Sequence, residues 1–185
     1  NRSLIRGAMK NCSVFAICIQ EGRAKKCSKR KWGEFVVCSS AAVKGQYGCE
    51  IWINSCVAIG TVDGEFVYVS ADDVSIIYHA PRALIIAVRA GPFCFAMVSF
   101  HAPHASSPQF SEWWEGFPKI WAIALGVGPV VGGVDFNHQL KCPPIVPFVG
   151  GIRLLPSAPS AAAVATYAPE LVAASQCVLT SSIAV

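Results

Sequence analysis

Three of the most hydrophobic runs in this sequence end in compact clusters of polar residues. Carboxylates, imidazoles and carboxamides can hold a divalent cation and contact an anionic substrate, and Mg²⁺ in proteins is usually completed by substrate phosphate. Ligand sites of layered folds gather where strand ends meet along one edge. If these three run ends meet, we expect a site for a divalent cation and an anionic substrate. The cluster residues are Gln20 and Glu21 after VFAICI, His101 and His104 after FAMVSF, and Asp135, Asn137 and His138 after PVVGGV.

Each cluster also has an ordinary structural interpretation when it is taken alone. Gln20 and Glu21 fit the exit of any strand, and two histidines around Pro103 fit a loop. Asp-Phe-Asn after a strand is a common turn composition. The order and spacing of the three clusters favour the functional interpretation over these alternatives.

Most of the elements that must position the clusters are predicted to be strands. Short apolar runs rich in β-branched and aromatic residues predict strands, and apolar residues at three- and four-residue steps predict helices. Gly45 and Gly48 predict a hairpin connection. The element order predicts an α/β (α+β) layered fold around a mainly antiparallel sheet. We expect strands over 13–19, 34–40, 48–54, 65–70, 75–78, 83–89, 93–100 and 129–134, and helices over 3–10, 111–125 and 170–178.

Length and composition narrow the function classes. The 185 residues suit one domain, 1–185, with an irregular Pro/Ala-rich segment over 141–169. Hydrophobic residues make up 54% and charged residues 14%, which excludes a mainly disordered chain. The uncharged run 120–134 is shorter than the ~20 residues that a membrane-spanning helix needs, so no membrane partner is expected. Nine cysteines without C-x-x-C spacing favour reduced thiols in an intracellular compartment.

Positive charge is concentrated near the start of the chain. Ten of the 15 lysines and arginines lie within residues 1–44, which also contain Glu21 and Glu34. The densest run, RAKKCSKRK over 23–31, fits either a solvated loop or a loop that contacts phosphates, and it also resembles a nuclear address. The candidate nucleic-acid-binding residues in this run are Arg23, Lys25, Lys26, Lys29, Arg30 and Lys31.

Taken in order, the motifs resemble those of the endonuclease/exonuclease/phosphatase family, and within it the apurinic-type endonuclease domain of non-LTR retrotransposons. The resemblance covers about residues 1–140. Its specificity lies in the series, which is similar to the family's Q-E-T/S motif, Gly-rich apolar strand, YxPN or HAPH motif and GDFN motif. The matching segments are IQEGR at 19–23, QYGCEIWIN at 46–54, PRALIIAVR at 81–89, VSFHAPH at 98–104, EWWEGF at 112–117 and GGVDFN at 132–137.

The resemblance implies a four-layer α/β/β/α sandwich and phosphodiester cleavage of DNA that depends on Mg²⁺ or Mn²⁺, without a small-molecule cofactor. Glu21 matches the metal-binding glutamate, Asp135 the aspartate that activates water, and Asn137 the asparagine that contacts the scissile phosphate. His101 and His104 stand where other members have Tyr and Asn near the phosphate. A retroelement origin implies a nuclear location, and the oligomeric state is open.

The sequence also departs from the family pattern. It has no Asp-His dipeptide, which in the family carries a histidine that acts on the phosphate, and the first-strand asparagine has no match. Val134 replaces the Gly of GDFN, and its β-branched side chain is expected to crowd the phosphate. We therefore expect a partial domain, truncated or catalytically impaired. The alternatives are a non-catalytic nucleic-acid-binding protein and, less favoured, a small membrane-associated protein.

Overall fold

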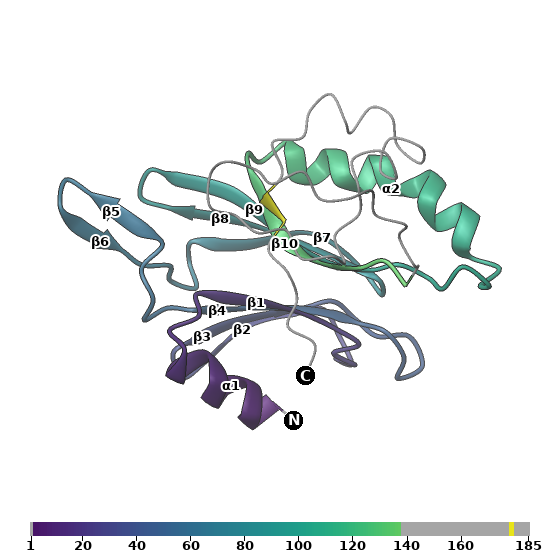
Figure 1. The fold of residues 1–185 in the computed structure, drawn as a ribbon, viewed down its shortest axis with the longest axis horizontal. Helices are drawn as coiled ribbons and strands as arrows, with labels where there is room; N and C mark the ends of the chain where they lie inside the picture. Colours follow the sequence, from purple (N-terminus) through teal and green to yellow (C-terminus); the bar gives the residue numbers. More distant parts are fainter. Residues whose placement is uncertain (1, 138–177, 180–185) are drawn as a thin grey trace, which may run out of the picture.

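Two β-sheets lie face to face in the computed structural model, which describes residues 2–137 and 178–179 (Figure 1). The first sheet is antiparallel, in the order β1-β4-β3-β2. The second sheet has the order β11-β10-β9-β8-β7, with parallel pairing of β10 to β9 and to β11. A two-stranded arm, β5-β6, projects at one end (Figure 1). The strands are β1 (Ala16–Gln20), β2 (Ser28–Trp32), β3 (Phe35–Ser39), β4 (Cys49–Asn54), β5 (Gly60–Val62), β6 (Glu65–Val67), β7 (Val74–Ala80), β8 (Ala83–Ala90), β9 (Phe93–His101), β10 (Val130–Asp135) and β11 (Val178–Leu179).

The main core fills the space between the two sheets. Its side chains come from alternate positions of the strands. Nearly every residue of β3, β4 and β8 is buried, because both faces of these strands are covered. Val36 and Ile51 from the first sheet pack in this core with Leu84, Ile86 and Met97 from the second sheet. The continuous apolar runs of the sequence therefore become doubly buried strands.

One helix covers the outer face of each sheet (Figure 1). Met9 of α1 (Arg2–Asn11) packs with Phe35 and Trp52 on the first sheet. α2 (Phe110–Leu125) packs Phe117 and Trp121 against the second sheet, and it forms the crossover between parallel strands β9 and β10. Such crossovers need a dozen or more residues, which α2 supplies. The layers are therefore helix, sheet, sheet and helix.

The predicted α+β class with mainly antiparallel sheets is confirmed, and most predicted strands lie within a few residues of observed ones. The basic run was wrongly expected to be a loop throughout, because residues 28–32 form edge strand β2 beside β3. Charged side chains are a common protection of an edge strand. The strand expected over 65–70 ends at Val67, and the short strand β5 was not expected. The expected irregular segment 141–169 lies outside the described residues, as does the expected helix 170–178 apart from its last residue, Val178, which belongs to β11.

Two further features belong to the described part of the chain. Neither described helix is long and apolar enough to cross a membrane. The seven cysteines in the described ranges are free thiols, and Cys38 and Cys49 are fully buried among apolar side chains of the central core.

Candidate functional site

The polar clusters lie at one end of the space between the sheets. Side chains alternate along a strand, so every second residue of β1, β9 and β10 faces the opposite sheet. On β9, Phe100 packs under α2, so Ser99 and His101 face inward. On β10, Val134 packs under α2, whereas Asp135 follows it on the other face. The inward positions therefore change from apolar in the core to polar at this end.

Strand register places His101 beside Asp135. β9 and β10 pair in parallel with these two residues as Cα partners at the last position of both strands. The His101 Nε2 atom lies 3.9 Å from Asp135 Oδ2, within ion-pair range but longer than a hydrogen bond. His101 is buried, and its Nδ1 atom has no hydrogen-bond partner among the described residues.

Opposing effects set the proton affinity of His101. Burial lowers the pKa of His101 below its ordinary value, because the charged imidazolium loses solvent. The Asp135 carboxylate opposes this lowering, the Arg82 guanidinium adds to it, and the Glu21 carboxylate opposes it, in descending order of size. The field of Glu21, which follows a strand of the first sheet, thus reaches the end of the second sheet.

Gln20 ties the ends of the two sheets together. Its Nε2 atom donates to Ser99 Oγ and to the Gly133 carbonyl oxygen, both at 3.2 Å. The Ser99 hydroxyl in turn donates to the Ile19 carbonyl oxygen at 3.2 Å. The sheets approach so closely here that a Cβ atom on Gly133 would lie 2.8 Å from Cys18 Cβ. Gly133 and Gln20 therefore fix the end of β1, and with it Glu21, against β9 and β10.

Asn137 is held beside the ends of β9 and β10. Its backbone N–H donates to Asp135 Oδ1 at 2.9 Å, and its side-chain Nδ2 donates to the Ala102 carbonyl oxygen at 2.8 Å. Its φ of 47° is left-handed, a conformation that Asn tolerates better than most residues. Within residues 2–137 and 178–179, the Ala102 carbonyl is the one acceptor recorded for the two Nδ2 protons.

Glu21 occupies a strained turn. Its φ is 57°, and Arg23 has a φ of 55°. The turn is fixed to the loop before β4, because Gly22 N–H donates to the Gly48 carbonyl at 2.8 Å and Arg23 N–H to the Tyr47 carbonyl at 3.0 Å. Left-handed non-glycine residues are costly and gather at functional sites. The turn exposes 55% of the Glu21 side chain, whose Oε2 lies 3.6 Å from Arg23 Nη2.

A buried carboxylate supports this turn from below. Glu50 of β4 is 1% exposed; it pairs with the Arg2 guanidinium of α1 and accepts a 2.8 Å hydrogen bond from Trp52 Nε1. A Cβ atom on Gly22 would lie 2.5 Å from Glu50 Cγ, so the turn rests directly on the Glu50 side chain. Glu50 thus links α1 to the turn that carries Glu21, because it pairs with Arg2 of α1 and supports Gly22.

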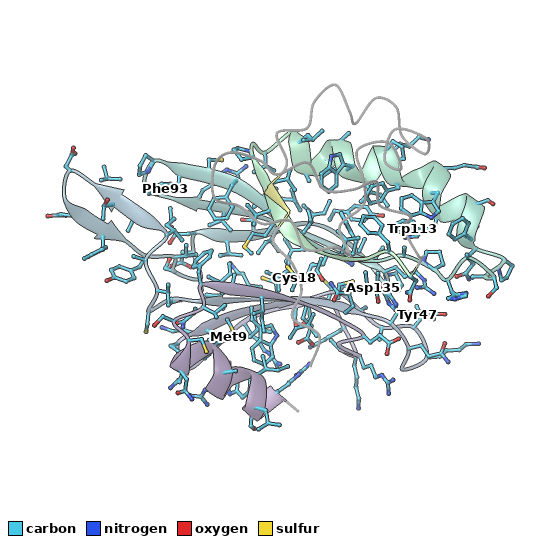
Figure 2. All side chains as sticks on the ribbon, viewed as in Figure 1. Met9, Cys18, Tyr47, Phe93, Trp113 and Asp135 are labelled. Carbon is cyan, nitrogen blue, oxygen red and sulfur yellow. The ribbon has the colours of Figure 1, made fainter. Side chains whose placement is uncertain are left out.

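An open pocket of about 250 Å³ lies beside the turn, lined by Glu21, Arg23, Gln46 and Tyr47. The Tyr47 ring lies 6.1 Å from the His101 ring, centroid to centroid, and the Arg82 guanidinium carbon lies 3.8 Å from the Tyr47 centroid. Asp135 and Tyr47 lie toward the same end of the molecule in Figure 2. One residue of the pocket lining, Tyr47, therefore lies close to His101 of the His101–Asp135 pair.

Tyr47 and Arg82 are the residues that sequence reasoning missed. Both lie in segments that resemble the family pattern, Tyr47 before Gly48 and Arg82 after Pro81, and neither was assigned a role of its own. Their contact joins residues 35 positions apart, and no local pattern reports it. The sequence signal that could have indicated them is their position, since each stands next to a turn residue at the start of a strand.

Two residues near this edge make local contacts. Within the described residues, the hydrogen bonds of His104 are to Ser106, in its own loop. The expectation that Val134 crowds the phosphate is wrong, because its side chain packs on the α2 side of β10, away from Asp135. The alternation of the strand sets that direction.

The basic residues divide into two groups. Arg23, Lys25 and Lys26 are exposed in the loop after β1, and Arg23 lines the pocket. On strand β2, Lys29 uses its ammonium group on the carbonyl oxygens of Ala71 and Val74, each at 2.8 Å. Arg30 and Lys31 follow on that strand and are exposed. The structure thus places one group, not the whole run, next to the candidate site.

The carboxylates at this edge are of the ligand type that Mg²⁺ and Mn²⁺ bind. Mg²⁺ binds proteins through one or two carboxylates, with water and substrate phosphate filling the remaining positions. Glu21 and Asp135 offer accessible carboxylates, with side chains 55% and 48% exposed. Among the described residues, no three His, Cys, Asp or Glu side chains are grouped closely enough to enclose an ion. An ion would therefore depend on ligands from the substrate.

No protein-family model matches the sequence, and a search of curated proteins found no match.

Proposed function

We propose that this protein is a slow, metal-dependent phosphodiesterase that nicks DNA at the edge formed by Glu21, His101, Asp135 and Asn137. The observation that carries the proposal is the parallel register of β9 and β10, which pairs His101 with Asp135 and leaves Asn137 immediately beyond. The motif resemblance to endonucleases is independent support from the sequence.

The roles of the residues follow from their chemistry. Glu21 would hold Mg²⁺, which when bound supplies positive charge to the phosphoryl oxygens. The Asp135 carboxylate orients a water molecule and accepts its proton as the water oxygen attacks phosphorus. The bond from phosphorus to the leaving sugar oxygen breaks, and that oxygen takes a proton from solvent. The remaining Nδ2 proton of Asn137 donates to a phosphate oxygen.

The proposed rate is low because the chain lacks a residue for one family role. The family's Asp-His histidine has no equivalent among the four histidines of this chain. His101 has a carboxylate neighbour, but its lowered pKa favours the neutral imidazole, which stabilises phosphate charge less than an imidazolium. Loss of one group from such a site commonly costs ~10²-fold or more in rate.

Nicking of supercoiled plasmid by the purified chain tests the proposal. We expect slow conversion to open circles with Mg²⁺ or Mn²⁺ and none with EDTA. Conversion that is equally fast in EDTA would contradict a metal-dependent site. Absence of conversion at enzyme excess over long incubation would also reject catalysis.

A second candidate function is nucleic-acid binding without cleavage. The exposed Lys25 and Lys26, in the loop that also carries the pocket residue Arg23, favour it, since phosphate contacts by lysine need no catalytic geometry. DNA binding that persists in a preparation without nicking activity would select this function over the first.

A further inference from the structure

We propose that the pocket lined by Glu21, Arg23, Gln46 and Tyr47 binds an unpaired nucleobase, with Tyr47 and Arg82 as its stacking platform. This inference deepens the proposed function, because it names the part of a nucleic-acid strand that the site recognises beside the phosphate. It assigns a binding role to two side chains for which the catalytic proposal has no use.

The backbone around Tyr47 fixes the platform in position. The φ of Tyr47 is 64°, a costly conformation for a bulky aromatic residue. Its carbonyl oxygen accepts from Arg23 N–H at 3.0 Å, and the next residue, Gly48, donates to the Pro81 carbonyl at 2.7 Å. The ring is therefore held in place before any ligand arrives, which reduces the entropy lost on binding.

Arg82 supports the ring and connects it to the catalytic strand end. Its guanidinium carbon lies 3.8 Å from the ring centroid, and its Nη1 atom donates to the carbonyl oxygens of His101 at 3.3 Å and Ala102 at 3.4 Å. A cation over the face of an aromatic ring is attractive. Tyr47 lines the pocket and Arg82 does not, so the proposed base would stack on the part of the ring that the guanidinium leaves open.

The charge of the pocket favours a base over a phosphate. Glu21 Oε2 lies 3.6 Å from Arg23 Nη2, so the positive charge of Arg23 is offset within the pocket. A phosphate gains little net attraction there, whereas an uncharged base stacks on the ring and can bond its edge to the Gln46 amide. Base–aromatic stacking works for every base, so we expect little sequence preference.

The position of the platform also fits a nucleotide. The Tyr47 ring is 6.1 Å from the ring of His101, and His101 adjoins Asp135. A nucleotide carries its base and its phosphate one sugar apart. A base on Tyr47 therefore leaves its own or the adjoining phosphate close to the edge where cleavage is proposed.

Binding of two single-stranded DNA oligomers tests the inference. One carries thymine at every position, and the other has the same length and phosphates but only abasic sites. Fluorescence anisotropy in EDTA, at low and high salt, measures both affinities without cleavage. We expect the wild-type chain to prefer the thymine oligomer by about 5- to 10-fold, with the preference retained at high salt because stacking is not screened.

Three variants locate that preference. Tyr47→Leu should abolish it while leaving affinity for the abasic oligomer unchanged, and Tyr47→Phe should retain it. Tyr68→Leu is the matched control, because Tyr68 is 49% exposed and its ring contacts that of Phe66 in the projecting arm at a tilted angle of 54°. It should bind as wild type does. Circular dichroism shows whether each variant folds. If Tyr47→Leu does not fold, Arg82→Gln replaces it as the test variant, because it removes the guanidinium that supports the ring and should weaken the preference.

The possible outcomes separate this inference from the proposed function. Equal wild-type affinity for both oligomers overturns the base platform and leaves the phosphate edge standing. A preference that survives Tyr47→Leu, or that Tyr68→Leu removes, also overturns it. Failure to bind either oligomer rejects the platform and nucleic-acid binding together.

Discussion

At the residue scale, the site depends on a histidine whose charge is unfavourable where it lies. His101 is buried at the end of β9, and its Nε2 atom faces Asp135. Burial, which lowers the pKa of His101, is the largest influence on it, and the nearby carboxylates only partly oppose it. The folded protein thus holds a neutral imidazole under conditions in which an exposed histidine begins to take up a proton.

This imbalance predicts a pH dependence of stability. The folded-state pKa of His101 is below the unfolded value of about 6.5, so the unfolded chain binds more protons at acidic pH. Above about pH 6.5, the titration of His101 therefore costs the folded state no stability. As the pH falls below that value, proton uptake by the unfolded chain lowers the free energy of unfolding. Urea denaturation at pH 7.5 and pH 5.5 should show a smaller loss of stability in His101→Gln than in wild type. An equal loss in the two proteins would show that His101 is not the group concerned.

At the element scale, the turn that carries Glu21 is supported by a side chain of a neighbouring strand. Gly22→Ala would place a Cβ atom 2.5 Å from Glu50 Cγ, and Glu50 cannot move easily because Arg2 and Trp52 hold its carboxylate. Overpacking of this kind costs about 1–3 kcal/mol. We expect Gly22→Ala to lower the free energy of unfolding by that amount.

Gly7→Ala is the matched control for this prediction. Gly7 lies inside α1, and a Cβ atom there meets nothing within 4 Å. Alanine favours helix over glycine by up to about 1 kcal/mol, so this variant should be as stable as wild type or more stable. Chemical denaturation measures the free energy of unfolding of both variants. Equal values for Gly22→Ala and Gly7→Ala would show that the contact of Gly22 with Glu50 leaves room for a Cβ atom.

The division of the basic run predicts an unequal salt dependence of DNA binding. Replacing Lys25 and Lys26 by Gln should reduce the slope of log affinity against log salt by up to about 2, since each duplex phosphate contact contributes about 0.9. Replacing Arg30 and Lys31, on edge strand β2, should change the slope less. If the β2 replacements flatten the slope as much as the loop replacements, the strand half of the run also contacts DNA.

The elements that could be predicted from the sequence are those with a local pattern. Apolar runs such as 83–88 identified buried strands, and the spacing of Trp113, Phe117 and Trp121 identified α2. Strand β2 lacked any apolar signal because its charged residues extend along a sheet edge. The direction of Val134 depends on which face of β10 meets α2, and that follows only from the assembled layers.

At the scale of the whole molecule, the candidate site forms where the central core ends. Figure 2 shows Cys18 between the sheets, with Asp135 and Tyr47 toward one end and Phe93 near the other. Gln20 and Gly133 join the sheets at the site end. The sequence indicated which residues end the three runs, but the meeting of these ends results from packing between sheets. The approach of Arg82 to Tyr47 is equally non-local.

Nicking by two aspartate variants tests the central claim most directly. Asp135→Asn removes a carboxylate at the proposed edge, whereas Asp63→Asn makes the same change in the turn of the projecting β5-β6 arm. With Mg²⁺, we expect Asp63→Asn to nick supercoiled plasmid at the slow wild-type rate. Asp135→Asn should lose about 100-fold or more and fall to background. Nicking that continues unchanged in Asp135→Asn would mean that the active centre lies elsewhere and that the residue assignments are wrong.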